Sequence, residues 1–329
     1  MEFRESSLEG MGKMRVLVTG ATGFIGANLV HSLVDKGYEV HIFLRETSDT
    51  WRINDIIGKV SKHYCDLTDR NKVKETIAEI KPQIIFHLAI YGGYPFQKNS
   101  IKIINTNFIG TVNLLSACVN NGFECFVNTG SSSEYGVKDK PMSESDILEP
   151  INDYGVAKAA STLYCQSVAK RYSLPVFTLR LFSPYGYYES PTRLIPYLIT
   201  SCLQNKEINL SRPDTVRDFV FIDDVIDAYF RVVKESKNLK SGDIFNIGSG
   251  KQHNLKEVFE IISKLTGYVK MPHWGKANER ESDIAKVWEA DITKAKEILK
   301  WSPKFILKDG LEKDVQWFEK NLHLYEDKV

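Results

Sequence analysis

A tyrosine and a lysine four residues apart are the clearest acid–base pair in this sequence. In Tyr154-Gly155-Val156-Ala157-Lys158 the two side chains fall on one face of a predicted helix. A free tyrosine titrates near pH ~10, and a neighbouring ammonium lowers its pKa because it stabilises the phenolate. Tyr154 can then exchange a proton with a carbonyl or hydroxyl oxygen while a hydride moves. Lys158 can also reach the ribose of a dinucleotide.

Three serines offer the hydroxyl that such a pair needs beside the reacting oxygen. Ser131, Ser132 and Ser133 directly follow a predicted strand over 125–130. A hydroxyl at this place can hydrogen-bond the oxygen that Tyr154 serves. A tyrosine and a lysine at this spacing also occur by chance, so the serine segment is what favours a catalytic interpretation.

A glycine-rich turn follows the first predicted strand, in residues 16–26, which read VLVTGATGFIG. Gly20 permits a tight turn, Gly23 lets a pyrophosphate approach the backbone, and Gly26 lets the next helix pack closely on the strand. The spacing is GxxGxxG instead of the common GxGxxG. The helix N-terminus presents N–H groups and a positive dipole to phosphate, which favours a dinucleotide site over a purely structural turn. The residues expected to contact the dinucleotide here are Gly20, Thr22, Gly23, Phe24, Ile25 and Gly26.

The end of the second predicted strand bears on the choice of cofactor. NAD sites usually carry an acid there for the ribose 2′-hydroxyl, whereas NADP sites place an arginine near the 2′-phosphate. This chain has Arg45 followed by Glu46. Arg45 favours NADP(H), and NAD(H) is the alternative. Asp66 and Leu67 follow the third predicted strand, where Asp66 can accept a bond from the adenine amino group or shape the local turn.

Apolar strands alternate with helices through the first half of the chain. The predicted strands are 15–19, 39–44, 59–65, 83–88, 125–130 and 175–181, and the predicted helices are 23–36, 69–80, 99–120 and 154–172. This alternation predicts βαβ units and a doubly wound parallel sheet, an α/β fold of the Rossmann type. Ligands bind beyond the carboxyl ends of the strands in such sheets. The glycine turn, Arg45 and the serine segment all fall at those ends.

The pattern loosens after residue 182, where prolines punctuate it. Further helices are predicted over 193–204, 223–237, 254–265, 292–299 and 308–320, and a strand over 243–247 returns to the main sheet. This predicts a smaller, interleaved α/β domain that binds the substrate. The predicted division is a flexible leader over 1–13, a dinucleotide-binding domain over 14–182 plus about 215–248, and a substrate domain over 183–214 and 249–329.

The composition excludes several classes of partner. Of 329 residues, 43 are Lys or Arg and 42 are Asp or Glu, so 43 − 42 gives a formal net charge of +1. A near-neutral chain has no general attraction for nucleic acid or for an anionic membrane. No stretch approaches the ~20 consecutive apolar residues of a membrane span. The five cysteines lack zinc-type or CxxC spacing, which predicts reduced thiols, no metal site and a cytoplasmic location.

Taken together, the motifs resemble those of the extended short-chain dehydrogenase/reductases. TGATGFIG, HLA at 87–89, NTNFIGT at 105–111, SSSEYG, YGVAK and LRLFSPYG occur in this order. Over about residues 14–320 the chain resembles the NAD(P)-dependent epimerase/dehydratase family, which acts on nucleotide sugars. The resemblance implies a nucleotide-diphosphate sugar as substrate. It also implies a homodimer, since relatives pack their long helices into a four-helix bundle and the predicted helices 99–120 and 154–172 carry apolar faces.

The resemblance also implies a role for each catalytic residue. Tyr154 is the acid and base, Lys158 is its partner, and Ser131 is the hydroxyl, with Ser132 as the alternative register. Asn107, in the NxxGT element, holds the geometry around the lysine. The cofactor contacts implied beyond the glycine turn are Leu88, Ala89, Asn107, Tyr154 and Lys158.

Two arginines match the family's contacts to the nucleotide diphosphate. Arg217 lies in VRDFVFIDDV, and a guanidinium suits phosphate because it is planar, always charged and bidentate. Arg280 matches the second arginine. The alternatives are an ion pair between Arg217 and Asp218, and a solvated charge at Arg280. Ser183, which stands where many members have Asn, and Arg193 are the other expected substrate contacts.

The serine segment also bears on the reaction. Members that dehydrate sugars carry an acid directly after the catalytic hydroxyl, whereas this chain has Ser132 and Ser133 there and Glu134 one position later. This disfavours a 4,6-dehydratase. SSSEYG and RDF resemble the GDP-4-keto-6-deoxyhexose reductases, so our first hypothesis is NADPH-dependent reduction of a 4-keto sugar nucleotide. A 4-epimerase with tightly bound NAD is the alternative. A non-catalytic dinucleotide-binding sensor is a third hypothesis, which the retained Tyr154 and Lys158 argue against.

Overall fold

The computed structural model describes residues 14–94, 96–279 and 281–325. The predicted leader over 1–13 and the predicted phosphate contact Arg280 therefore lie outside the described residues.

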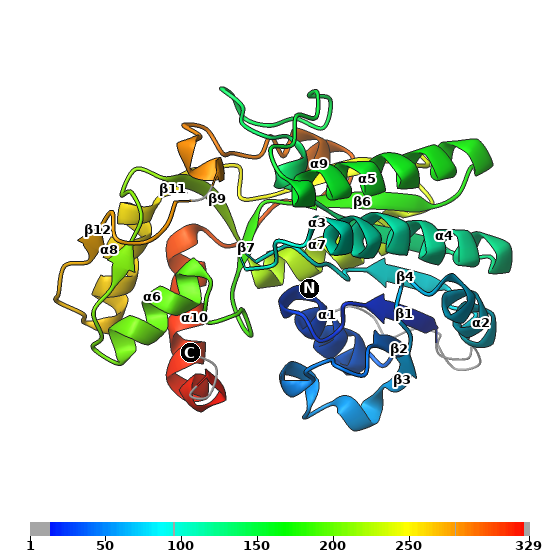
Figure 1. Cartoon of the computed structure of the whole chain (residues 1–329), viewed down its shortest axis with the longest axis horizontal. Coiled ribbons are helices and arrows are strands. Elements are labelled where there is room, and N and C mark those ends of the chain that lie inside the picture. Colours follow the sequence, from blue (N-terminus) through cyan, green and yellow to red (C-terminus); the bar gives the residue numbers. More distant parts are fainter. Residues whose placement is uncertain (1–13, 95, 280, 326–329) are drawn as a thin grey trace.

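Seven parallel strands form the main sheet, in the order β10-β6-β5-β4-β1-β2-β3 (Figure 1). Their bounds are β1 Arg15–Thr19, β2 Glu39–Leu44, β3 Ser61–Tyr64, β4 Ile84–His87, β5 Cys125–Ser131, β6 Val176–Leu181 and β10 Ile244–Ile247. The chain builds outward from β1 to β3 and then, on the other side, from β4 to β10. The carboxyl ends of β1 and β4 therefore flank the switch point at which doubly wound sheets bind ligands. The predicted α/β fold is confirmed.

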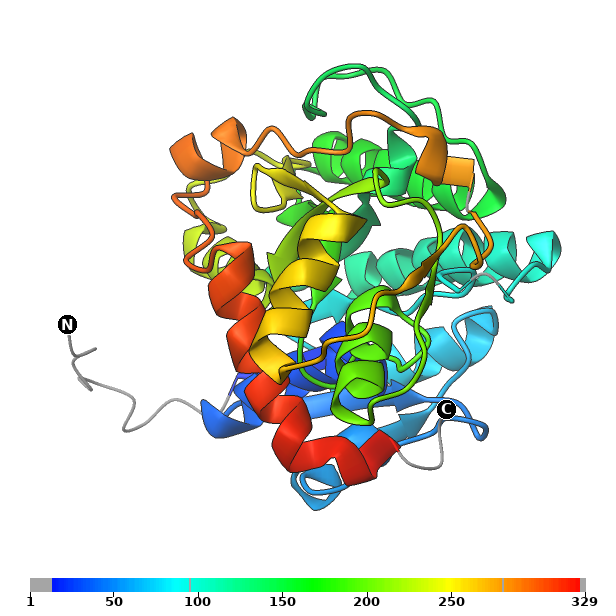
Figure 2. The same ribbon diagram turned by 90° about the vertical axis from the view of Figure 1, so that its left-hand side faces the viewer.

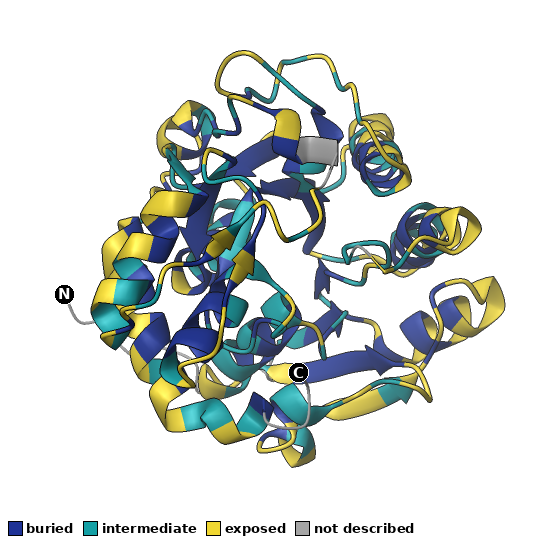
Figure 3. Cartoon of the chain, turned by 60° about the vertical axis from the view of Figure 1, so that its left-hand side comes forward, coloured by how far each residue is buried: buried dark blue, intermediate teal, exposed yellow. Residues whose placement is uncertain are grey.

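Helices cover both faces of this sheet, because successive strand residues point to opposite sides. Val16 and Val18 of β1 belong to the apolar cluster under α1 and α7, whereas Leu17 belongs to the cluster under α2, α4 and α5. The helix bounds are α1 Phe24–Asp35, α7 Ile222–Glu235, α2 Arg70–Ile80, α4 Gly110–Asn121 and α5 Asp153–Tyr172. The strands are buried between these layers except for β3 at the edge of the sheet, which is mostly exposed, and the outward faces of the helices are exposed (Figure 3).

The long helix predicted over 99–120 contains an irregular turn. It consists of α3 (Ser100–Ile104), a π-helical turn (Asn105–Ile109) and α4. The backbone carbonyl of Asn107 in this turn accepts hydrogen bonds from the Thr111 and Ser161 hydroxyls, at 2.6 and 2.7 Å. Ser161 lies on α5, so the turn is tied to the helix that carries the predicted acid–base pair.

The remaining chain forms a smaller α/β unit at the carboxyl edge of the main sheet (Figure 1). A three-stranded sheet has the order β11-β9-β7, and β8 pairs with β12. The strand bounds are β7 Ser183–Tyr185, β8 Asn209–Leu210, β9 Val216–Phe221, β11 Gln252–Asn254 and β12 His273–Trp274. The later helices are α6 Leu194–Leu203, α8 Leu255–Thr266, α9 Thr293–Glu297 and α10 Leu307–Asn321. In Figure 2, α10 (red) runs alongside α8 and α6, which it contacts.

The chain crosses between the two units more than once. β10 pairs with β6, so the predicted return to the main sheet is confirmed. β9 was not predicted as a strand. It falls within the range 215–248 that was expected to extend the dinucleotide domain, yet it pairs with β7 and β11 in the small sheet.

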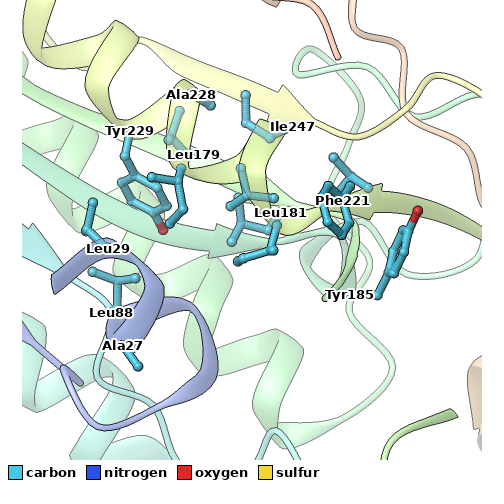
Figure 4. Packing of buried hydrophobic residues seen from close by; sticks show 14 of the residues in the cluster. Ala27, Leu29, Leu88, Leu179, Leu181, Tyr185, Phe221, Ala228, Tyr229 and Ile247 are labelled. Atoms are coloured by element: carbon cyan, nitrogen blue, oxygen red, sulfur yellow. The ribbon is translucent and has the colours of Figure 1, made fainter. Parts of the chain in front are cut away.

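One hydrophobic core joins the two units. In Figure 4, Leu179 and Leu181 of β6 pack beside Tyr229 of α7, and Phe221 and Tyr185 continue the same cluster toward the small sheet. The smaller unit is thereby held against the edge at which ligands are expected. All five cysteines are buried and form no disulfide, as expected for thiols in the core. Among the described residues, no helix is long and apolar enough to cross a membrane.

Candidate active site

A cleft of about 1740 Å³ separates the carboxyl edge of the main sheet from the smaller unit. Residues at or just beyond the ends of β1 to β6 line one side. Residues of β7, α6 and β9 line the other, together with Ala277, Asn278, Glu279, Asp283 and Trp288. A ligand in this cleft would therefore touch both units of the chain.

The glycine turn after β1 leaves room for a phosphate. Gly20 has φ +72°, in the left-handed region, and a Cβ there would meet the backbone of Leu88 and Ala89. A Cβ at Gly26 would overlap the Gly20 carbonyl oxygen. α1 starts after Gly23, and in the described part of the chain no side chain caps its first turn, so its N–H groups can face a phosphate. The predicted turn residues that line the cleft are Gly20, Thr22, Gly23, Phe24, Ile25 and Gly26.

An arginine directly follows the last residue of β2. Leu44 is the last residue of the strand and is buried, and Arg45 is exposed at the cleft rim. Arg52 lies in the same region but donates to the carbonyls of Tyr188 and Thr22, at 2.7 and 3.2 Å. Arg52 therefore braces the glycine turn, and Arg45 is the cation that this segment presents to the cleft.

Asp66 and Leu67 line the cleft just beyond β3. One carboxylate oxygen of Asp66 accepts bonds from the N–H and hydroxyl of Thr68, at 2.8 and 2.7 Å. Burial acts to raise the pKa of Asp66, but these bonds and the charges of Arg45 and Lys102 outweigh it, so the pKa is lowered. Asp66 thus shapes the local turn, one of its two predicted roles, and also presents a carboxylate to the cleft.

Leu88 and Ala89 extend β4 along the cleft, and Asn107 is buried behind them. The Asn107 amide donates to the Tyr91 carbonyl at 2.6 Å and accepts from the Tyr91 N–H at 2.9 Å. Its backbone carbonyl accepts from Ser161 on α5. Asn107 therefore joins the segment after β4 to α5 and does not itself line the cleft.

Ser131 and Tyr154 meet where β5 ends and α5 begins. Both residues line the cleft, and the Ser131 side chain is close enough to act on the pKa of Tyr154. Burial raises the pKa of Tyr154, while Ser131 and the charge of Arg193 act to lower it, and the net pKa is raised. Tyr154 is therefore a protonated phenol at neutral pH, as a group that donates a proton must be.

Lys158 lies one helical turn beyond Tyr154 and is 3% exposed. Burial lowers the pKa of its ammonium, and the negative charge of Glu134 acts to raise it. Within the described residues, this ammonium makes no hydrogen bond or ion pair. A buried charge without such partners is costly. Lys158 does not itself line the cleft and lies behind Tyr154, which does.

The two serines that sequence reasoning left as alternatives have different partners. Ser132 is 5% exposed, and its hydroxyl accepts a bond from the Trp288 indole N–H at 3.3 Å. Ser132 therefore bonds Trp288, whereas Ser131 is the serine that acts on the pKa of Tyr154. Glu134 is fully buried and pairs with Arg180 at 2.7 Å, so its carboxylate is held away from the cleft.

Arg217 reaches the cleft from β9. Its guanidinium pairs with Asp283 at 2.5 Å and lies over the Trp288 ring, 5.2 Å from the ring centroid. The alternative prediction, a pair with Asp218, is wrong about the partner. Asp218 is fully buried and accepts bonds from the N–H and hydroxyl of Ser249, at 2.6 and 2.7 Å.

Arg193 and Ser183 line the same side of the cleft. Arg193 sits at the N-cap of α6, lies 5.1 Å from the centroid of the Tyr94 ring, and pairs with Glu189 at 3.9 Å. Its charge acts on Tyr154, so it lies on the side of the cleft near the acid–base pair.

Asp283 and Trp288, the partners of Arg217, are cleft residues that were not predicted from the sequence. Asp283 lies in a charged run that is typical of solvated surface, yet it is 5% exposed. Trp288 is an aromatic residue in a charged segment, and that contrast is the signal that could have indicated burial.

Comparisons with known proteins agree with this geometry. The model of the NAD dependent epimerase/dehydratase family matches residues 16–248. An uncharacterized UDP-glucose epimerase, YtcB, of Bacillus subtilis (strain 168) is 27% identical over 320 residues, which cover 92% of this chain and 98% of that protein. The UDP-glucose 4-epimerase of Thermotoga maritima, solved with UDP-glucose, superposes with a TM-score of 0.86 at 29% identity, covering 94% of this chain and 100% of that one. The dTDP-glucose 4,6-dehydratase of Bacillus anthracis str. Ames, solved with NAD, superposes with a TM-score of 0.84 at 27% identity, covering 96% of this chain and 100% of that one.

Proposed function

This chain belongs to the NAD dependent epimerase/dehydratase family, and from that premise we propose that it moves a hydride and a proton at C4 of a nucleotide-diphosphate sugar. The observation that carries the proposal is that Ser131 and Tyr154, with Lys158 one helical turn behind, lie on the same cleft as the glycine turn. The complexes of relatives with UDP-glucose and with NAD support both ligands.

The chain's own residues handle the proton. A nicotinamide dinucleotide, when bound, supplies or takes up the hydride. In the reducing direction Tyr154 donates its phenolic proton to the sugar O4 as C4 changes from carbonyl to alcohol, and Ser131 orients that oxygen. Lys158 stabilises the resulting phenolate, which solvent then reprotonates. In the oxidising direction each of these proton transfers runs backward.

Reduction of a 4-keto sugar nucleotide is the direction we favour. Arg45 at the end of β2, where NAD sites usually carry an acid, suits NADP(H), which is exchanged between turnovers. Ser132 and Ser133 occupy the positions of the dehydratase acids, and Glu134 is held by Arg180. The positions that carry the acid in dehydratases therefore hold no acid in this chain.

A 4-epimerase is the second candidate, because several relatives bear that name. The two candidates differ in what the purified protein carries. Mass spectrometry of the released cofactor should find an empty or NADPH-containing site for a reductase, and tightly bound NAD for an epimerase. Oxidation of NADPH with a 4-keto sugar nucleotide, without conversion of UDP-glucose to UDP-galactose, would decide for the reductase.

We also propose that the substrate's nucleotide is held by the smaller unit, residues 183–214 and 249–329, together with Arg217. The dinucleotide is then held by 14–182 and the elements α7 and β10. This division is supported by the lining of the cleft, whose glycine turn and diphosphate arginine come from different sheets.

Arg45 should set the preference between the two dinucleotides. Arg45→Asp is expected to remove or reverse a preference for NADPH over NADH, because a charge-assisted bond to the 2′-phosphate contributes about 1.5–3 kcal/mol, or about tenfold or more in affinity. Titration of the fluorescence of NADPH and NADH measures both dissociation constants. Lys59→Asp makes the same charge change at an exposed residue outside the cleft and should leave the ratio unchanged. A parent protein that already binds NADH more tightly would contradict the argument.

A homodimer is expected through the helices α3 and α5. Their outward faces carry exposed apolar side chains, among them Ile101 at 68%, Val156 at 49% and Leu163 at 54% exposure. Light scattering at micromolar concentration should give twice the 37.5 kDa of one chain. Leu163→Glu should give the monomer mass, and Val269→Glu, at an 89% exposed site near β12, should not. A parent protein of single-chain mass would contradict the prediction.

A further inference from the structure

Glu134 is a fully buried carboxylate that takes no part in the proposed reaction, yet it lies directly behind the catalytic residues. One of its oxygens accepts the backbone N–H of Ser131 at 2.8 Å and the hydroxyl of Thr162 at 3.0 Å. The other accepts the Arg180 guanidinium at 2.7 Å. Three separate elements, β5, α5 and β6, are thus joined at one carboxylate.

The first consequence concerns Ser131. Ser131 and Glu134 form a reciprocal capping box around the short helical turn Ser132–Glu134, in which the Ser131 side chain accepts the Ser133 N–H and Glu134 accepts the Ser131 N–H. A Cβ at Gly130 would lie 2.6 Å from the carboxylate oxygen, so glycine there makes room for it. The backbone of the catalytic serine is therefore fixed by Glu134.

The second consequence concerns Lys158. Thr162, which donates to Glu134, lies four residues after Lys158 on the same face of α5. The carboxylate is therefore on the side of the helix from which Lys158 projects, and its charge acts to raise the lysine pKa against burial.

In the part of the chain that the structure describes, no titratable group other than Glu134 is found to act on Lys158 with a negative charge at neutral pH. His87 of β4 is buried with a pKa of about 3, lowered by burial and by Lys158, so it is neutral. Burial raises the pKa of Cys165, on α5, to about 12, so it is a thiol. Tyr154 is a phenol. Arg180 is the cation paired with Glu134.

We infer that Glu134 is a positioning residue of this site, which fixes the backbone of Ser131 and supplies the negative charge that keeps the Lys158 ammonium protonated. The inference rests on the proposed function, because it assigns that charge to the lysine of the acid–base pair. The inference also explains why the acid of this chain stands one position later than the acid of the dehydratases. The Glu134 oxygens accept bonds from Arg180 and from Thr162 of α5, and they do not face the sugar.

The test measures dinucleotide affinity against pH without any sugar, by fluorescence of NADPH and, in parallel, NADH. The dinucleotide affinity of the parent should fall as the pH rises through the pKa of Lys158, and the pH at which half of this fall has occurred is the midpoint. Lys158→Ala should remove this pH dependence and with it the midpoint. Glu134→Gln keeps the shape of the side chain and removes its charge. Its midpoint should move down by about 1 pH unit or more, because an opposite charge favours the protonated form of the lysine.

Two further variants separate charge from structure. Thr162→Val removes one bond to the carboxylate and keeps the charge, so its midpoint should match the parent's. Should Glu134→Gln fail to fold, Glu134→Gln with Arg180→Met removes both members of the buried pair and should show the same downward shift. The inference would be overturned if the folded Glu134→Gln protein had the same midpoint as the parent. It would also be overturned if the parent had no midpoint, or had one that Lys158→Ala did not remove. Lack of turnover on 4-keto sugar nucleotides would instead count against the proposed function and leave this binding result in place.

Discussion

Tyr154→Phe should lower turnover by at least the roughly 10²- to 10⁴-fold that is typical of losing a general acid or base. The variant keeps the ring and its packing beside Ser131 but has no proton to transfer. Folding and dinucleotide affinity should stay close to the parent's, because the phenol oxygen contributes to neither the core nor the glycine turn. The measurement is single-turnover hydride transfer to a 4-keto sugar nucleotide, followed by NADPH absorbance.

The same helix offers a matched control. Tyr164 lies on α5, and its hydroxyl meets the Ser116 hydroxyl at 3.1 Å. Tyr164→Phe removes an equivalent hydroxyl away from the cleft and should leave hydride transfer near the parent's rate. Near-parental transfer by the Tyr154→Phe protein would remove the acid–base assignment and most of the case for the proposed reaction.

Two companion variants extend this prediction. Lys158→Ala should reduce both turnover and dinucleotide affinity, because its buried ammonium stabilises the phenolate and is the group expected to meet the ribose. Ser131→Ala should reduce turnover with less effect on dinucleotide affinity. The effects of the three changes should be strongly non-additive, because the residues act as one unit. Effects that simply multiply would indicate independent contributions instead.

The main sheet could be predicted from the sequence because its signals are local and strong. β1, β2 and β6 are buried apolar runs, and the predicted bounds of β2 agree with the structure to the residue. The glycine turn and the pair at 154 and 158 were predictable for the same reason, since each is a short motif beside a strand or within a helix. The residues that meet in the cleft are those that such sheets place at their carboxyl ends.

The partners of the site residues could not be predicted in the same way. Arg217 and Asp283 are 66 residues apart, and their pairing depends on how the segment after β12 folds back over β9. β9 itself was not predicted because Arg217 and Asp218 interrupt its apolar run. Asp218 is nevertheless fully buried, and its carboxylate accepts hydrogen bonds from residues 249, 250 and 290. Long-range pairing also gives Glu134 its role, since its contacts with Arg180 and Thr162 come from two other elements.

Arg217→Ala should weaken binding of the nucleotide sugar by about 10- to 150-fold. Charge-assisted hydrogen bonds contribute about 1.5–3 kcal/mol each, and 1.4 kcal/mol corresponds to a factor of ten. Affinity for NADPH and NADH should change little, because Arg217 lies on β9 in the small sheet and the glycine turn follows β1 in the main sheet. Calorimetric titration with nucleoside diphosphates, UDP, dTDP, GDP and CDP in turn, measures the first effect without knowledge of the sugar.

The pairing of Arg217 with Asp283 decides how this variant must be controlled. Asp283 is 5% exposed, and breaking a buried ion pair by removing one partner costs about 3–5 kcal/mol in stability. Asp283→Asn together with Arg217→Ala removes that penalty, so the double variant should regain stability in thermal unfolding and still bind the diphosphate weakly. Arg217→Lys keeps the charge but loses the bidentate fork, and it should fall between the parent and Arg217→Ala. Equal loss of diphosphate and dinucleotide affinity in the folded double variant would make Arg217 a structural residue, and the diphosphate would then have to be held elsewhere in the cleft.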